Sequence, residues 1–125
     1  MKRLLVTAGE PAGIGPELCL TLAGSNSSAL QDAEIIIVAD MGLLQDRALQ
    51  LGLSIDFCYA SLEQSLTPTA HNQLKVLHVP LKVESRAGHL DADNSAYVLN
   101  TLSIACDACL NGHADAMVTA PVHKG

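Results

Sequence analysis

Short apolar runs alternate along this chain with longer segments in which apolar residues recur every three or four positions. The short runs have the length and β-branched content of strands, and they predict strands at residues 3–7, 34–40, 55–60, 75–81 and 116–120. The longer segments predict helices at residues 15–24, 43–51 and 94–111. The elements therefore follow one another in the order β-α-β-α-β-β-α-β.

This order of elements is typical of an open α/β sheet. The run E-I-I-I-V-A-D at residues 34–40 is unbroken, as expected for a parallel strand that is covered on both faces. Pro16 stands at a first helical position, and Gly52 and Gly112 follow the last residues of the other two helices. We predict a mostly parallel sheet flanked by helices, with residues 1–125 forming a single α/β unit.

Composition and charge exclude several classes of protein. Of the 125 residues, 49% are apolar and 16% are charged, which is too apolar for a disordered chain. The net charge is −6 and the seven basic residues are scattered, so a nucleic-acid-binding surface is not expected. The longest apolar run, Ile35–Ala39, is far shorter than the ~20 residues that a membrane span needs. Because the apolar start of the chain is interrupted at Gly9, we predict no signal peptide and expect a cytoplasmic protein with reduced cysteines.

The glycine turn, T-A-G-E-P-A-G-I-G-P-E at residues 7–17, follows the first predicted strand and opens the first helix. Ligands of open α/β sheets bind at the carboxyl ends of strands, and glycines there let backbone N–H groups approach an anion. The spacing is neither the dinucleotide fingerprint nor the P-loop. A tight turn with positive φ at Gly9 and Gly13 is an equally good interpretation. Glu10 faces either a ligand or the solvent.

Asp40 has two interpretations. It ends the second predicted strand, where a dinucleotide-binding fold carries the acid that binds the ribose. An aspartate in this place is more often the N-cap of the following helix, and without the glycine fingerprint we favour the cap.

Cys106 and Cys109 form a C-D-A-C sequence near the end of the last predicted helix. Redox pairs of this spacing use a helix N-terminus, whose positive end lowers the thiol pKa, and zinc would need two further ligands. We therefore predict buried structural thiols. His71, His78 and His113 are predicted to be structural or solvated, because the histidines show no metal-binding spacing.

Three segments carry a family resemblance. They are the glycine turn, A-G-H-L-D-A-D-N-S-A-Y-V at residues 87–98, and A-C-D-A-C-L-N-G-H-A-D-A-M-V-T-A-P-V-H-K-G at residues 105–125. With them the chain resembles the 4-hydroxythreonine-4-phosphate dehydrogenase (PdxA) family, although Ala8 stands where a proline is usual. Because family members are more than twice as long, the resemblance covers their N-terminal portion.

The resemblance implies a fold similar to the isocitrate and isopropylmalate dehydrogenases and a homodimer. It also implies NAD and a divalent metal cation (zinc, magnesium or cobalt) as cofactors. The family oxidises a small phosphorylated amino acid, 4-hydroxy-L-threonine 4-phosphate, and the product loses carbon dioxide to give 3-amino-2-oxopropyl phosphate for pyridoxal phosphate (vitamin B6) biosynthesis.

The resemblance places the metal ligands and most of the substrate and nicotinamide contacts downstream of residue 125. We therefore expect no catalytic or metal-binding residue in this chain, and no dehydrogenase activity from these 125 residues alone. The glycine turn and the end of the last strand are expected at the same edge of the sheet. The residues expected near substrate or cofactor are Gly9, Glu10, Gly13, Gly15, Thr119, His123 and Lys124.

Two other hypotheses stay open at this point. One is a truncated, non-catalytic fragment of this family, because no helix follows the last predicted strand to cover it. The other is a simple nucleotide-binding α/β module that uses Asp40.

Overall fold

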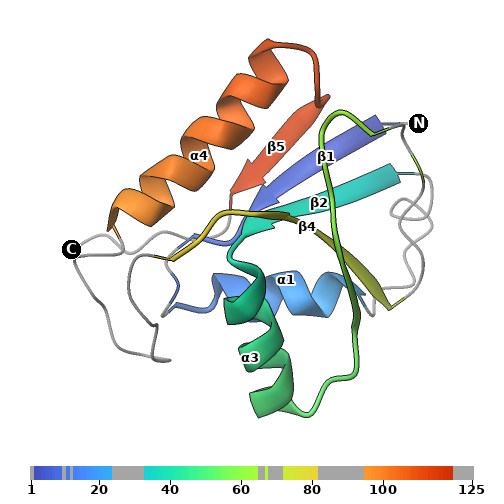
Figure 1. The fold of residues 1–125 in the computed structure, drawn as a ribbon, viewed down its shortest axis with the longest axis vertical. Helices are drawn as coiled ribbons and strands as arrows, with labels where there is room; N and C mark the ends of the chain where they lie inside the picture. Colours follow the sequence, from blue (N-terminus) through green and yellow to red (C-terminus); the bar gives the residue numbers. More distant parts are fainter. Residues whose placement is uncertain are drawn as a thin grey trace.

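Strands and helices form in the order that the apolar pattern predicts (Figure 1). The computed structural model describes residues 2–9, 11, 13–23, 33–64, 67, 72–81 and 95–119. The strands in these ranges are β1 (Lys2–Thr7), β2 (Ala33–Ala39), β3 (Asp56–Tyr59), β4 (Gln73–His78) and β5 (Ala116–Thr119). The helices are α1 (Gly15–Ala23), α3 (Met41–Leu51) and α4 (Ser95–Leu110). The loops predicted around residues 25–32 and 84–94 lie outside the described residues.

The strands form one sheet in the order β3-β4-β2-β1-β5. Every pair of neighbouring strands in the described part of the chain is parallel. Val6 of β1 pairs with Ile37 of β2 on one side and with Val118 of β5 on the other. The first described strand therefore lies between the next strand in the sequence and the last one.

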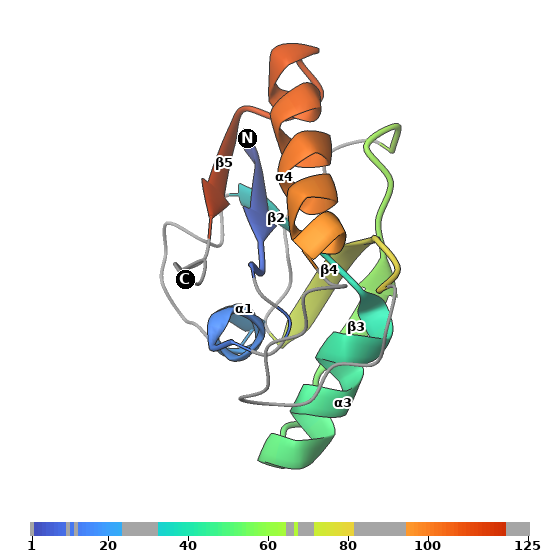
Figure 2. The same ribbon diagram turned by 90° about the vertical axis from the view of Figure 1, so that its left-hand side faces the viewer.

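Two apolar clusters, one on each face of the sheet, form the core. Leu20 of α1 and Leu44 of α3 belong to the same cluster as Ile37 of β2. Ala105 of α4 belongs to the other cluster, with Leu5 of β1, and Figure 2 shows α4 along this face of the sheet. β2 is buried at every position, as its unbroken apolar run predicts. Helices thus flank the sheet on both sides, and the predicted α/β architecture is confirmed.

The fourth strand ends earlier than the sequence predicts. β4 stops at His78, whereas the apolar run predicts a strand up to Leu81. Pro80 has no N–H group to donate to a neighbouring strand, and the Leu81 N–H donates instead to the Asp40 carboxylate at 2.8 Å. The segment after His78 therefore turns toward the start of α3.

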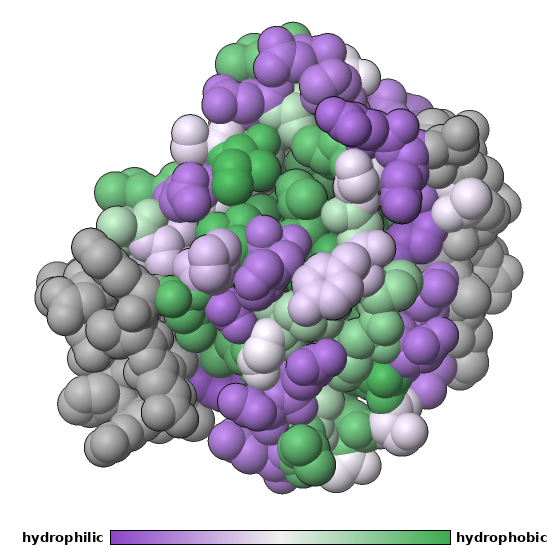
Figure 3. Space-filling view, viewed as in Figure 1, coloured by the Kyte–Doolittle hydropathy of each residue, from purple (hydrophilic) through white to green (hydrophobic). Residues whose placement is uncertain are grey.

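Apolar side chains also reach the surface. On the face drawn in Figure 3 they gather between α4 and the segment that follows β3, with polar side chains around them. On the opposite face, a groove of about 400 Å³ runs between α1 and β5. Leu18 and Val118 line this groove and are 49% and 54% exposed, so no described residue covers them fully. Among the described residues, no helix combines the length and apolar content that crossing a membrane requires.

A buried cluster of charged side chains lies at the amino edge of the sheet. Glu34 of β2 accepts a hydrogen bond from Arg3 Nε of β1 at 2.6 Å and from Lys75 Nζ of β4 at 2.9 Å. The Thr67 N–H donates to the same carboxylate at 3.0 Å. Burial alone would raise the pKa of the Glu34 carboxyl group, but the contacts with Lys75, Thr67 and Arg3 outweigh burial and lower the pKa from 4.5 to about 2.

Arg3 also joins this cluster to the segment that follows β3 and to the segment that precedes β5. Its Nη1 donates to the carbonyl oxygens of Leu62 and His113 at 2.8 and 3.2 Å, and its Nη2 donates to that of Gln64 at 2.6 Å. The Arg3 N–H donates to the Asp115 carboxylate at 2.8 Å. The cluster therefore holds the segments before β5 and after β3 against the sheet.

Candidate functional site

The carboxyl ends of β1 and β5 bring two predicted site residues to the same edge of the sheet. Thr7, the last residue of β1, pairs in register with Thr119, the last residue of β5. Gly9 follows two residues after Thr7 and begins the glycine turn. The expectation that the turn and the end of β5 share one edge is therefore confirmed, and this is the edge at which open α/β sheets bind ligands.

The glycine turn has the conformation that its sequence predicts at Gly9, whose φ is 75°. That left-handed conformation favours glycine, because in any residue with a Cβ atom it brings steric strain. Positive φ at Gly13 stays a prediction, because residue 12 lies outside the described residues. Gly15 is buried and begins α1. Glu10, His123 and Lys124 also lie outside the described residues, so their expected places near a ligand stay predictions.

Arg47 of α3 contacts the glycine turn, although it is not among the site residues that the sequence predicts. Its side chain is almost fully buried, and Nη2 donates to the Pro11 carbonyl oxygen at 2.8 Å. Nη1 lies 3.8 Å from the carboxylate of Glu17, in the first turn of α1. The signal was present in the sequence: an arginine occupies one of the apolar-periodic positions of this helix, next to Ala48. A cation at such a position needs a buried acceptor, and the turn supplies it.

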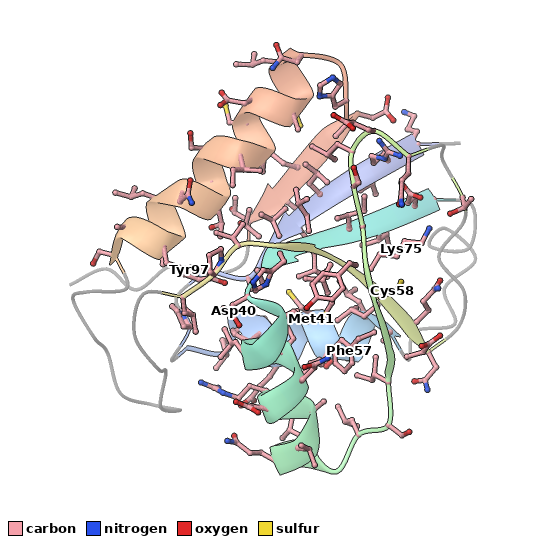
Figure 4. The ribbon with its side chains drawn as sticks, viewed as in Figure 1. Asp40, Met41, Phe57, Cys58, Lys75 and Tyr97 are labelled. Atoms are coloured by element: carbon pink, nitrogen blue, oxygen red, sulfur yellow. The ribbon has the colours of Figure 1, made fainter. Side chains whose placement is uncertain are left out.

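Asp40 joins three segments at the carboxyl end of β2. One carboxylate oxygen accepts from the Leu43 N–H at 2.9 Å and caps α3, and the other accepts from the Leu81 N–H. The Asp40 N–H donates to the hydroxyl oxygen of Tyr97 at 2.9 Å. Figure 4 shows Tyr97 reaching from α4 to this point, beside Asp40. The N-cap interpretation is confirmed, and both carboxylate oxygens are already hydrogen-bonded to the backbone.

His78, at the end of β4, also binds the backbone at the start of α3. Its Nδ1 accepts a hydrogen bond from the Met41 N–H at 3.0 Å, so the ring proton of the neutral imidazole lies on Nε2. The ring of Tyr59 meets the His78 ring edge-on, with centroids 6.0 Å apart. These contacts support the predicted structural role of His78. His113 is exposed, as predicted, and His71 lies outside the described residues.

Thr7 carries a buried hydroxyl at this edge. The residue is fully buried, and its Oγ1 has no hydrogen-bond partner among the groups that the structure describes. A buried hydroxyl without a partner loses its hydration without compensation. The carboxyl edge thus contains one polar atom that the fold itself does not use.

Replacing Thr7 by valine is expected to raise the free energy of unfolding by about 1 kcal/mol, because valine has the same shape and no hydroxyl to desolvate. Urea unfolding followed by circular dichroism measures the change. Thr101→Val is the matched control: Thr101 is equally buried, but its Oγ1 donates to the Val98 carbonyl oxygen at 2.7 Å. That variant is expected to lose about 1 kcal/mol. A loss of stability in Thr7→Val would contradict the prediction.

The cysteines are free thiols in the described part of the chain, but their burial differs from the prediction. Cys19 is buried, and burial raises its pKa to about 12. Cys109 is half-buried, whereas Cys106 is exposed, so the prediction of a buried thiol is wrong for Cys106. The reason is the helical period: positions 106 and 110 lie on the outer side of α4, where Leu110 is also exposed. Within the described ranges, no group of three or more potential metal ligands forms a site.

Comparison with known proteins identifies relatives over nearly the whole chain. Residues 31–125 match the family described as "Pyridoxal phosphate biosynthetic protein PdxA". A 4-hydroxythreonine-4-phosphate dehydrogenase of Marinobacter nauticus is 51% identical over 122 residues, which is 98% of this chain and 35% of that protein. The one from Chromobacterium violaceum is 48% identical, with the same coverage of both chains. The chain therefore spans about a third of the length of these relatives.

A solved structure supports the fold. The crystal structure of a 4-hydroxythreonine-4-phosphate dehydrogenase from Burkholderia phymatum aligns with a TM-score of 0.83 at 18% identity, covering 99% of this chain and 37% of that chain. At this identity the similarity concerns the fold alone. It confirms the fold of the isocitrate and isopropylmalate dehydrogenases that the family resemblance implied.

Proposed function

Because the chain belongs to the PdxA family of pyridoxal phosphate biosynthetic proteins, we propose that it is an N-terminal portion of a 4-hydroxythreonine-4-phosphate dehydrogenase. The observation that carries this proposal is the 51% identity to a relative of that name over 98% of the chain. The relative is about three times as long, so the complete activity belongs to a polypeptide with further residues. Such a protein acts in the cytoplasm as a homodimer, as the family resemblance implies.

The proposed reaction is an oxidation followed by a decarboxylation. The hydrogen at C3 of 4-hydroxy-L-threonine 4-phosphate leaves as hydride, and the C3 hydroxyl loses its proton. The resulting ketone is β to the carboxylate, so the C1–C2 bond breaks and carbon dioxide leaves. The electron pair remains on C2 as an enolate, and a proton then adds there to give 3-amino-2-oxopropyl phosphate. NAD, when bound, would supply the acceptor for the hydride.

The residues of this chain that we assign to the site lie at the carboxyl edge of the sheet. Gly9 and Gly15 shape the glycine turn and the start of α1, where backbone N–H groups favour an anionic group. Thr119 lies beside the turn at the end of β5. The parts of the chain that the structure describes form no set of metal ligands, so we assign no step to a metal held by them. Orientation of a phosphorylated ligand is the role that this edge supports best.

The proposal predicts that activity depends on residues beyond this chain. We expect the protein, at the length at which its own cells make it, to form NADH and carbon dioxide in equal amounts from 4-hydroxy-L-threonine 4-phosphate. The isolated 125-residue chain is expected to form neither. NADH absorbance and carbon dioxide release, measured with both polypeptides at equal concentration, check this, with unphosphorylated 4-hydroxy-L-threonine as the control substrate.

Each result of this comparison has a defined meaning. If the isolated chain turns the substrate over, the assignment of the catalytic residues to a downstream segment is wrong. If the naturally produced protein has the mass of these residues alone, 13.1 kDa, and is inactive, the non-catalytic fragment is the correct alternative. The nucleotide-binding alternative has no support from Asp40, because both of its carboxylate oxygens accept backbone hydrogen bonds.

A further inference from the structure

A buried arginine connects α3 to the glycine turn. Arg47 is 2% exposed. Its Nη2 donates a hydrogen bond of 2.8 Å to the main-chain carbonyl oxygen of Pro11, which lies in the middle of the turn. Pro11 is itself fully buried. The ion pair with Glu17 is long, at 3.8 Å, and the Glu17 side chain is 44% exposed, so it contributes little. The hydrogen bond to the Pro11 carbonyl oxygen therefore connects the guanidinium group to the turn.

The hydrogen bond between Arg47 and Pro11 depends on direction, whereas apolar packing does not. A guanidinium group is planar and permanently charged, and it fixes the direction of each acceptor that it binds. Here it enters the turn from α3, whose own position is fixed by the Asp40 cap and by Leu44 in the core. The position of the Pro11 carbonyl is thereby defined relative to β2 and not only relative to β1 and α1. A methionine or leucine at position 47 would fill the space without defining that direction.

We propose that Arg47 is a positioning residue: by binding the Pro11 carbonyl oxygen it holds the glycine turn in place, and it thereby supports the binding of a phosphate-bearing ligand at the carboxyl edge of the sheet. The identity of that ligand rests on the proposed function, in which both NAD and the substrate carry phosphate. The positioning itself rests on the hydrogen bond to Pro11 and on the burial of both residues. Arg47 does not contact the reacting atoms in this proposal.

The first test measures the turn directly. Hydrogen exchange of the backbone N–H groups of residues 13–15, 17 and 18 is compared among the parent protein, Arg47→Met and Arg47→Lys, since Pro16 has no N–H. We expect exchange to accelerate about tenfold in Arg47→Met, because the turn opens locally once its anchor is lost. Arg47→Lys, which can still donate one hydrogen bond, is expected to exchange within about threefold of the parent. Leu44→Val is the matched control, because it loosens the packing of the same helix and keeps the arginine that binds the Pro11 carbonyl oxygen.

The second test measures ligand binding in the protein at its natural length. We expect Arg47→Met to raise the KM of either NAD or 4-hydroxy-L-threonine 4-phosphate about tenfold while kcat stays within about twofold. The KM that rises identifies which phosphate source the turn faces. Leu44→Val is expected to leave both KM values unchanged. A purely structural arginine would lower stability in the same way as Leu44→Val and would not separate KM from kcat.

The outcomes separate this inference from the proposed function. Unchanged exchange in Arg47→Met overturns the positioning role. Faster exchange with both KM values unchanged overturns the link to a ligand. If the parent protein has no dehydrogenase activity, the proposed function fails, and calorimetric titration of NAD into the parent and Arg47→Met then decides the inference. The same titration is made with 4-hydroxy-L-threonine 4-phosphate: unchanged Kd values for both ligands overturn the inference, and a Kd raised about tenfold for either one supports it.

Discussion

Replacing Glu34 by alanine is expected to lower the free energy of unfolding by about 3–5 kcal/mol. The substitution leaves Arg3 and Lys75 buried at the amino edge of the sheet without the carboxylate that compensates their charges. This is a large part of the stability of a domain of this size. Urea unfolding followed by far-ultraviolet circular dichroism is the measurement, because the chain contains no tryptophan for fluorescence.

The control for this prediction is Glu63→Ala. Glu63 is exposed, and removing it changes the net charge by the same amount, so the expected change is within about 0.5 kcal/mol. If both variants lost the same stability, the effect would come from net charge and not from the buried cluster.

The pH dependence of the free energy of unfolding is an independent measure of how much the Glu34 carboxylate stabilises the fold. The pKa of Glu34 is about 2 in the folded protein and ordinarily 4.5, so its ionised form is favoured by folding. The stabilisation is fully present above pH 4.5 and is lost as the pH falls toward 2. Its size is about 3 kcal/mol. Glu34→Gln cannot titrate, so we expect its stability to depend less on pH over this range, and an unchanged pH dependence would contradict the assignment.

Replacing Asp40 by alanine is expected to lower the free energy of unfolding by about 2–4 kcal/mol. The loss has two sources: the cap on the Leu43 N–H of α3, and the hydrogen bond that fixes the Leu81 N–H after β4. The same unfolding measurement applies. Because the two hydrogen bonds tie different segments, hydrogen exchange is expected to accelerate at both amides.

Asp40→Asn is the matched variant. The asparagine side chain keeps one acceptor oxygen for the cap and has none for the second amide, so we expect about half the loss. This variant also tests the nucleotide-binding hypothesis, because it changes the charge while keeping the fold. We expect its Kd for NAD to stay within about twofold of the parent. Loss of NAD binding by a folded Asp40→Asn protein would restore the ribose-binding interpretation of Asp40.

The sequence predicted the elements because their signals are local. The unbroken run of β2, the proline at the start of α1 and the glycines after α3 and α4 each act through neighbouring residues. The end of β4 was predicted too late, because the apolar run continues to Leu81 while the N–H of that residue bonds to Asp40, 41 positions earlier. Pro80 was a local signal within the run that the strand ends early, whereas the hydrogen bond to Asp40 leaves no pattern there.

The candidate site was predicted in part, for a similar reason. Gly9 and Thr119 could be placed at one edge because the topology of parallel strands requires it. Arg47 and Tyr97 could not, because their partners, Pro11 and Asp40, lie in other elements. The scattered basic residues likewise gave no sign that Arg3 and Lys75 meet at Glu34. Long-range polar contacts of this kind depend on the completed fold.

The place of β1 in the sheet sets an order of events during folding. β1 is synthesised before the other described strands, yet one of its two neighbours, β5, is synthesised last among them. The Arg3 N–H and the Asp115 carboxylate that meet there are 112 positions apart in sequence. Closing so long a loop costs entropy before any pairing compensates it, which slows folding. In a growing chain, the edge of β1 that later pairs with β5 therefore stays without its partner until residues 116–119 emerge.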